Sequence, residues 1–88
     1  MKKSIYENIS DVFDLPKDAL MDLPKIMLTG DREIYIENYK GILEYSDTVI
    51  RLSLVGKTLK ICGSEMDIRT IGETDITLSG RISGIEFI

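Results

Sequence analysis

Apolar and polar residues alternate with a period of two along most of the chain. Ile34 and Ile36 alternate with charged and aromatic neighbours, and Ile50 and Leu52 alternate with polar ones. This period places successive side chains on opposite faces of a β-strand, so each segment has one apolar and one polar face. Turn-forming residues separate the segments. The pattern predicts about eight strands, near residues 26–29, 33–37, 41–45, 48–54, 57–62, 65–70, 74–79 and 81–88.

Most of the predicted connections are about two to four residues long, whereas parallel neighbours need roughly a dozen or more. Neighbouring strands should therefore pair antiparallel as a meander. The alternation changes parity near Thr70 and across Ser83-Gly84, which is typical of a β-bulge. Because bulges bend a sheet, we predict a mainly β, single-domain fold curled into a two-layer roll or small open barrel. Gly84 should supply the backbone freedom, so Gly84→Val should harm folding more than Ser83→Val.

The spacing of the glycines suggests a second geometry. Gly56, Gly63, Gly72 and Gly80 recur every seven to nine residues, which also suits the rungs of a short β-solenoid. No other residue type is kept at this period, so the meander is favoured. Both geometries leave sheet edges open, and the last strand ends on Phe87 and Ile88 with no charged tail to shield it. Pairing with another copy through these edges is therefore a hypothesis.

The N-terminal region follows a different pattern. A helical spacing of apolar residues predicts a short amphipathic helix over residues 4–14, which Pro16 ends. We divide the chain into an N-terminal helical segment with a proline-containing linker (1–25) and an all-β domain (26–88). The helix is too short to be stable alone, so its apolar face packs either on the domain or on a partner. That face carries Ile5, Ile9, Val12 and Phe13.

Composition excludes several classes of function but does not identify one. The chain has 88 residues, of which 43% are hydrophobic and 30% charged, as expected of one globular domain. Its net charge of −4 lacks the basic excess of a nucleic-acid-binding protein. No apolar run is long enough for a signal peptide or a transmembrane helix. We expect a cytoplasmic protein, or one peripheral to a membrane.

Candidate catalytic chemistry is sparse. The chain has no histidine, and Cys62 has neither a CxxC partner nor a neighbouring base, so we interpret it as a small strand residue. Acidic pairs such as Glu33 and Glu37 have the spacing of a solvated strand face. We therefore predict no enzyme activity, no catalytic residues, no cofactor and no metal site.

A surface remains as the candidate site. Three tyrosines lie close to the turn at residues 37–41, and tyrosine is enriched in protein interfaces, although half-buried tyrosines of the sheet would explain them equally well. A curled sheet could instead enclose a small ligand or a lipid, which is the alternative function. The candidate interaction surface comprises Tyr35, Glu37, Asn38, Tyr39, Tyr45 and Phe87.

Several segments together resemble the YabP/YqfC sporulation protein family, with the YqfC branch the closer match. The family pattern has histidine where this chain has Tyr39, which argues against a histidine-dependent role at this turn. The backbone-shaping residues Asn38 and Gly41 are kept. The segments that carry the resemblance are Leu15-Pro16-Lys17-Asp18, Asp22-Leu23-Pro24-Lys25-Ile26, Ile36-Glu37-Asn38-Tyr39-Lys40-Gly41-Ile42-Leu43-Glu44-Tyr45 and Gly80-Arg81-Ile82-Ser83-Gly84-Ile85-Glu86-Phe87.

The resemblance implies a small protein of endospore-forming Firmicutes. It implies action in the mother cell during spore formation, as a non-catalytic assembly or adaptor module. It further implies a membrane partner like YqfD, encoded alongside, which would place the domain at the membrane around the forespore. These are expectations from the family and not from periodicity or charge.

Overall fold

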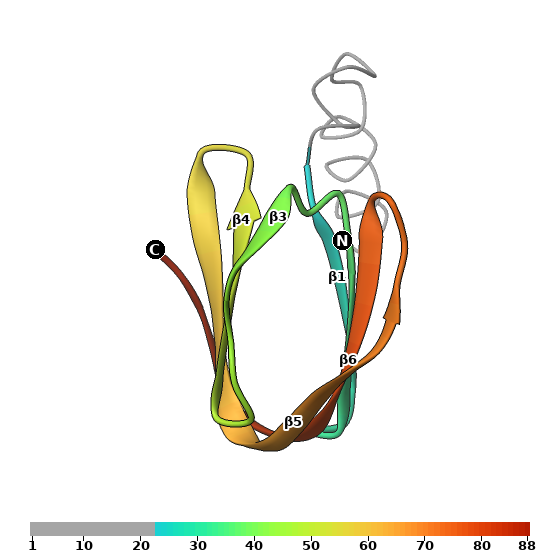
Figure 1. Ribbon diagram of the computed structural model, residues 1–88, viewed down its shortest axis with the longest axis vertical. Helices are drawn as coiled ribbons and strands as arrows, with labels where there is room; N and C mark the ends of the chain where they lie inside the picture. The colour runs from blue at the N-terminus through green and yellow to red at the C-terminus, as the bar shows by residue number, and fades with distance from the viewer. Residues whose placement is uncertain (1–22) are drawn as a thin grey trace, which may run out of the picture.

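The computed structural model describes residues 23–88, which form one antiparallel sheet of six strands (Figure 1). The order of the strands across the sheet is β1-β2-β6-β5-β4-β3. The predicted all-β fold class is confirmed, whereas the predicted helix at residues 4–14 lies outside the described residues. The strands are β1 (Lys25–Thr29), β2 (Glu33–Glu37), β3 (Gly41–Tyr45), β4 (Val49–Leu54), β5 (Lys57–Ile71) and β6 (Asp75–Phe87).

Strands β5 and β6 are long enough to serve both halves of the molecule. Residues 57–62 of β5 pair with β4, and residues 59–64 pair with residues 81–87 of β6, whereas residues 67–71 pair with residues 76–79 of β6 alone. The sheet folds over between these halves (Figure 1). The first leaf contains β1, β2, 75–79 and 67–71; the second leaf contains β3, β4, 57–62 and 81–87.

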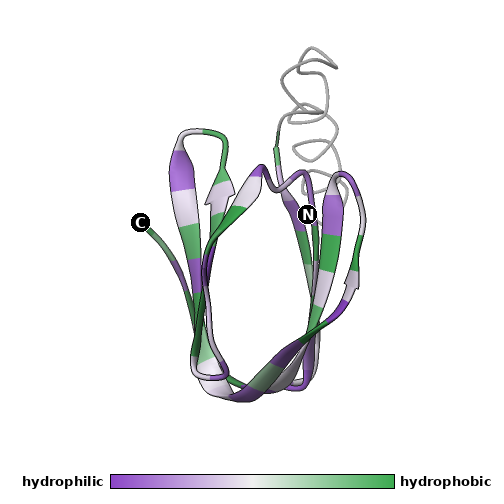
Figure 2. Cartoon of the chain, in the orientation of Figure 1, coloured by the Kyte–Doolittle hydropathy of each residue, from purple (hydrophilic) through white to green (hydrophobic). Residues whose placement is uncertain are grey.

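The core lies between the two leaves because each strand alternates apolar and polar residues. Ile34 and Ile36 of β2 are fully buried, while Tyr35 between them lies half-buried on the outer face. Figure 2 shows this alternation as bands of hydropathy along the strands. Each buried aliphatic side chain stabilises the fold by about 1.5–3 kcal/mol. Eight almost fully buried side chains fill the space between the leaves: Ile34, Ile36, Ile50, Leu52, Leu59, Ile61, Ile76 and Leu78.

Glycines let β5 and β6 cross closely where the sheet bends. A Cβ atom at Gly63 would overlap the carbonyl oxygen of Arg81, and one at Gly80 would lie 2.7 Å from the Cα atom of Met66. Gly80 also has a φ angle of 146°, which residues with a side chain rarely adopt. The bend therefore depends on the absence of side chains at Gly63 and Gly80.

Two hairpin turns, at residues 30–32 and 46–48, hold the bend from either side. Their carbonyl oxygens accept hydrogen bonds from backbone N–H groups of β6 and β5. We call this part of the molecule the bend end, and the opposite part, with the connections at 38–40, 55–56 and 72–74, the loop end. The bonds at the bend end run from Gly80 N to Arg32 O (3.0 Å), Ile82 N to Asp31 O (2.7 Å), Gly63 N to Thr48 O (3.0 Å) and Met66 N to Asp47 O (2.9 Å).

The strand positions agree with the predicted pattern, with two differences in how the strands connect. The segments predicted at 57–62 and 65–70 are one strand, β5, and those at 74–79 and 81–88 are β6, because their separating glycines form a bend and not a reversal. The meander also breaks once: β2 pairs with β6 and not with β3. Antiparallel pairing throughout removes the β-solenoid alternative, whose rungs are parallel.

The bulge predicted at Ser83-Gly84 is present, but its predicted cause was wrong. Cys62 pairs with Gly84 and Gly63 pairs with Ile82, so Ser83 is the extra residue. Gly84 has no positive φ angle, and a Cβ atom there would meet nothing within 4 Å. The structure therefore gives no reason for Gly84→Val to be more harmful than Ser83→Val. The second predicted parity change is confirmed, because the pairing register shifts between Ile68 and Thr70.

Candidate interaction site

The folded sheet has two open sides, where an edge of one leaf faces an edge of the other without a strand ladder between them. On one side β1 faces residues 81–87 of β6, and on the other β3 faces residues 67–71 of β5. We call these the β1/β6 seam and the β3/β5 seam. Unpaired edge strands offer backbone N–H and C=O groups to another chain, so both seams are candidate interaction sites.

The β1/β6 seam is lined mainly by apolar side chains. Leu28 pairs with buried Ile34 and so faces the same side of the sheet, yet its side chain is 53% exposed. Together with Ile82 and Ile85 it borders a hollow of about 310 Å³. Further towards the loop end, Phe87 is also 53% exposed and borders a second hollow of about 340 Å³. Among residues 23–88, the seam therefore presents apolar side chains that no other strand covers.

The Phe87 ring also has a cationic neighbour. The ammonium group of Lys57 lies 5.8 Å from the centre of the ring. This is within the range of a cation–π contact, which contributes roughly 0.5–1 kcal/mol at an exposed position. The remaining residues around this second hollow are Leu23, Pro24 and Val55, so apart from Lys57 it is apolar.

The β3/β5 seam is bridged by a polar contact. The Tyr45 hydroxyl donates a hydrogen bond of 2.9 Å to Oδ1 of Asp67, and so joins the second leaf to the first. This hydrogen bond is the main cause that raises the pKa of the Tyr45 phenol, and partial burial and the charge of Asp67 raise it further. The bridge leaves Ile42 and Leu43 of β3 exposed beside it.

Tyr39 and Asn38 shape the loop end. The Tyr39 side chain is 9% exposed and belongs to the core, and its hydroxyl lies 3.4 Å from the carbonyl oxygen of Gly72. Asn38 has a φ angle of 67°, its N–H donates to Thr74 O at 2.7 Å, and its side-chain amide donates to Leu23 O at 2.9 Å. Tyr39 is therefore a core residue and not part of an exposed surface.

Tyr35 and Glu37 lie on the outer face of the first leaf. Burial raises the pKa of the Tyr35 phenol, and the carboxylates of Glu37 and Asp75 raise it further. Tyr45 and Phe87 lie at different seams, as described above. The structure thus divides the six predicted surface residues among the core, the loop end, one outer face and two seams, and does not bring them together.

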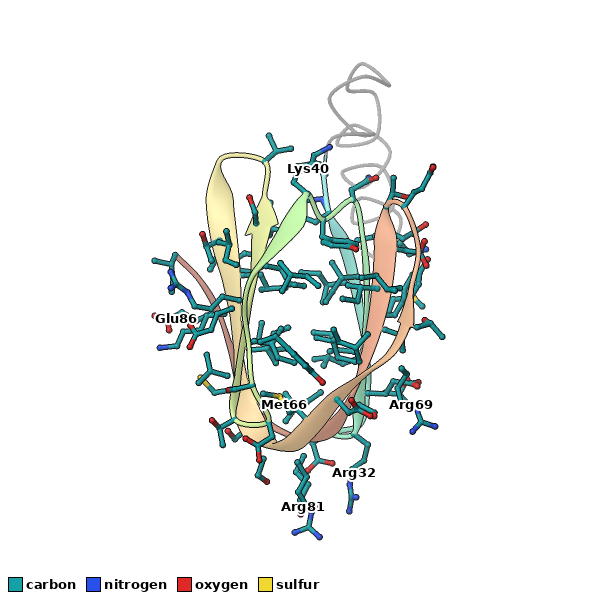
Figure 3. The ribbon with its side chains drawn as sticks, in the orientation of Figure 1. Arg32, Lys40, Met66, Arg69, Arg81 and Glu86 are labelled. Atoms are coloured by element: carbon teal, nitrogen blue, oxygen red, sulfur yellow. The ribbon has the colours of Figure 1, made fainter. Side chains whose placement is uncertain are left out.

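Three arginines at the bend end form a feature that the sequence pattern did not reveal. Arg32, Arg69 and Arg81 line one hollow of about 520 Å³, and Figure 3 shows all three at this end of the molecule. They come from the β1–β2 turn, from β5 and from β6. They are far apart along the chain, so only the pairing of β5 with β6 and the docked turn place them together.

The described residues offer little other chemistry. No group of three or more cysteine, aspartate and glutamate side chains within residues 23–88 could hold a metal ion. The acidic pair Glu33 and Glu37 lies at the two ends of β2 and faces outwards. In the same part of the chain there is no helix with the length and apolar character that a membrane crossing requires.

These features define a small all-β domain with a filled core, whose distinctive groups lie on its surface and along its open edges. Comparison with known proteins gives this class a family: the chain belongs to the YabP family, whose model matches residues 22–88. It is 34% identical over 80 residues to the uncharacterized protein YqfC of Bacillus subtilis (strain 168), covering 91% of this chain and 86% of that protein. No solved structure matches the chain.

Proposed function

We propose that this protein is a non-catalytic assembly or adaptor module that acts in the mother cell during spore formation, together with a membrane partner. Support for the cellular setting comes from the family. The chain belongs to the YabP family, and its resemblance to the YabP/YqfC sporulation proteins implies a role in sporulation and a YqfD-like membrane partner. Support for the molecular role comes from the surface, because edge strands and apolar side chains stay uncovered within residues 23–88.

The β1/β6 seam is the observation that carries the proposal. It combines two strand edges that form no ladder with another strand of residues 23–88 and side chains that face the core side of the sheet yet remain about half exposed, such as Leu28 and Phe87. A segment of a partner could pair with an edge through its backbone and cover these side chains at the same time. Strand addition of this kind is the mode of binding that we propose.

The alternative function, a barrel that holds a small ligand or lipid inside, has weaker support. Such a protein needs free volume between the two layers. Here the eight buried aliphatic side chains occupy that space, and the three hollows described above open at the surface. The filled core favours a role carried out by the outside of the molecule.

The first experiment measures binding of the full chain to the soluble part of a YqfD-like membrane protein, with the solution mass followed across concentrations. Leu28→Asp places a charge in the β1/β6 seam, and we expect it to weaken binding by about ten-fold or more. Met27→Asp is the matched control, because Met27 is 49% exposed on the same strand but faces outwards.

The two variants separate the seam from a general effect of charge. Equal loss in Leu28→Asp and Met27→Asp would contradict the seam as the binding site. A wild-type chain that stays monomeric at every concentration and ignores the membrane protein would contradict the adaptor role itself.

A second experiment tests the cellular setting. A fluorescent fusion to the full chain in a spore-forming host should appear only after sporulation begins, in the mother cell, and loss of the gene should reduce the yield of heat-resistant spores. A fusion present mainly in the forespore, or a normal spore yield without the gene, would contradict the proposed setting.

A further inference from the structure

The three arginines of the bend end differ from the other cations of the chain in both type and placement. The sequence contains four arginines and seven lysines, and three of the four arginines line the one hollow of about 520 Å³. No lysine lines it. The fourth arginine, Arg51, is in β4 of the second leaf. Arginine is the cation that recognises phosphate through a planar pair of N–H groups, so its concentration here is informative.

The charge balance of the hollow also differs from that of the chain. Its wall carries Arg32, Arg69 and Arg81 together with Glu33 and Glu65, so three positive and two negative charges leave a net charge of +1. The chain as a whole has a net charge of −4. Even with Asp31, which pairs with Arg32 beside the hollow, this region is less negative than the molecule as a whole and would attract a small anion more than its surroundings do.

The arginines are not committed to strong ion pairs. Nε of Arg81 lies 3.9 Å from Oε1 of Glu65, and Nε of Arg32 lies 3.5 Å from Oδ1 of Asp31, with all four side chains more than 60% exposed. Exposed ion pairs of this length contribute little to stability. Within residues 23–88 Arg69 forms no ion pair. A stronger acceptor could therefore bind to these guanidinium groups without displacing a structural contact.

Neutral donors line the same hollow. The hydroxyl groups of Thr29 and Ser79 border it, and neither takes part in a hydrogen bond with another residue of the 23–88 region. A phosphate group has more acceptor oxygens than a carboxylate and uses guanidinium and hydroxyl donors together.

We propose that this hollow binds a phosphate group, carried either by a soluble molecule or by a phospholipid headgroup, through the guanidinium groups of Arg69 and Arg81. Arg32 and the two hydroxyls complete the set of donors. Because the bend end is at the opposite end of the molecule from Phe87 and the loop end, the site does not depend on the adaptor function proposed above.

The binding experiment follows the arginine side-chain N–H signals of the full chain by NMR while inorganic phosphate is added. The signals of Arg69 and Arg81 should shift and saturate, whereas that of Arg51 should not. Arg69→Gln combined with Arg81→Gln should weaken phosphate binding by about ten-fold or more. Lys40→Gln combined with Lys57→Gln is the matched control, because it removes the same charge near the loop end and should leave binding within about two-fold.

A charge-preserving variant separates geometry from simple attraction. Arg69→Lys combined with Arg81→Lys keeps both positive charges but loses the paired donors, so phosphate binding should still weaken by several fold. Full retention of binding in this variant, or equal binding of acetate at the same ionic strength, would overturn the phosphate site. Both arginines lie on exposed positions, and an unchanged thermal transition of each variant would exclude unfolding as the cause.

Vesicles distinguish the two sources of phosphate. The full chain is sedimented with vesicles of phosphatidylcholine, alone or mixed with phosphatidic acid or phosphatidylserine. Stronger binding to phosphatidic acid than to phosphatidylserine, lost in the Arg69→Gln and Arg81→Gln variant, identifies a headgroup ligand. Saturable binding of inorganic phosphate without vesicle binding identifies a soluble one. The absence of both would overturn the proposal.

Discussion

The two ends of the molecule close the same folded sheet by different means. At the bend end, β5 and β6 cross so closely that Gly63 and Gly80 have no room for a side chain, and backbone hydrogen bonds from two turns hold the crossing. At the loop end, the ring of Tyr39 fills the space between the leaves, and its hydroxyl lies 3.4 Å from Gly72 O. One end depends on absent side chains and the other on a large one.

The difference predicts how each end tolerates change. An atom added at the bend end meets backbone, which cannot move without opening the sheet. Removing a side chain at the loop end leaves a gap that the 38–40 and 72–74 connections can partly fill, because they are loops. We therefore expect an atom added at the bend end to be more harmful than a side chain removed at the loop end.

The largest effect is expected for Gly80→Ala. Gly80 has a φ angle of 146°, and the new Cβ atom would lie 2.7 Å from the Cα atom of Met66. Backbone strain and overpacking each cost about 1–3 kcal/mol, so we expect a loss of about 4 kcal/mol in the free energy of unfolding. Urea denaturation of the full chain measures this loss.

Gly84→Ala is the control for Gly80→Ala. Gly84 lies in the same strand with no positive φ angle and open space around it, so the change should stay within about 1 kcal/mol of wild type. Similar losses in both variants would show that the close crossing of β5 and β6 does not determine stability.

The next effect is expected for Tyr39→Ala at the loop end. Removing a buried aromatic ring costs about 3–5 kcal/mol, and we expect the lower value because the neighbouring loops can relax. Tyr39→Phe keeps the ring and loses only the long contact to Gly72, so it should cost less than about 1 kcal/mol. A small loss in Tyr39→Ala would contradict the role of the ring as the closure of this end.

Local pattern predicts the strands well but not the features that depend on distant pairing. The alternation in residues 33–37 identifies β2, because burial of one face imposes it. The partner of β2 is β6, about forty residues away, and no local pattern in the sequence indicates this pairing. Glycine is typical of turns, so the pattern predicts a chain reversal at Gly80. Only the close crossing with Met66 shows that Gly80 forms a bend within one strand.

The candidate sites show the same limit. Tyr39 follows a turn-like Asn38 and has polar neighbours, so its pattern is that of a surface residue, yet the β2–β3 connection carries it between the leaves. The arginines at 32, 69 and 81 follow no motif and meet only in three dimensions. In contrast, the pattern of the last strand predicts Phe87 at an open sheet edge, and the structure places it at the β1/β6 seam with 53% of its side chain exposed.

A smaller effect is expected for Ser46→Ala in one of the two turns that hold the bend end. The Ser46 hydroxyl oxygen accepts hydrogen bonds from the N–H groups of Val49 (2.9 Å) and Thr48 (3.3 Å), which shapes the 46–48 turn. The carbonyl groups of this turn accept hydrogen bonds from β5. Loss of the Ser46 hydroxyl should therefore lower the free energy of unfolding by about 1 kcal/mol. Hydrogen exchange at the N–H of Met66 should rise with it.

Thr48→Ala is the control for this turn. It removes a hydroxyl whose side-chain contact is the 3.3 Å approach to the Ser46 hydroxyl, and leaves the bonds to the backbone in place. We expect little change in stability or in exchange at Met66. A larger loss in Thr48→Ala than in Ser46→Ala would contradict the proposed support of the bend end.

The smallest effect is expected for Tyr45→Phe, in how steeply the free energy of unfolding falls at alkaline pH. This measurement tests the Tyr45 bridge between the two leaves. The hydrogen bond to Asp67 raises the pKa of the Tyr45 phenol above its ordinary value of 10.0, so the folded state holds this proton more tightly than the unfolded chain does. The contribution is therefore complete below pH 10 and is lost as the pH rises through the folded pKa. Tyr45→Phe should make stability fall less steeply in that range, although the raised pKa of Tyr35 leaves some slope. Phenolate absorbance should show one late-titrating group fewer, and parallel stability curves for wild type and Tyr45→Phe would mean that this bridge does not hold the leaves together.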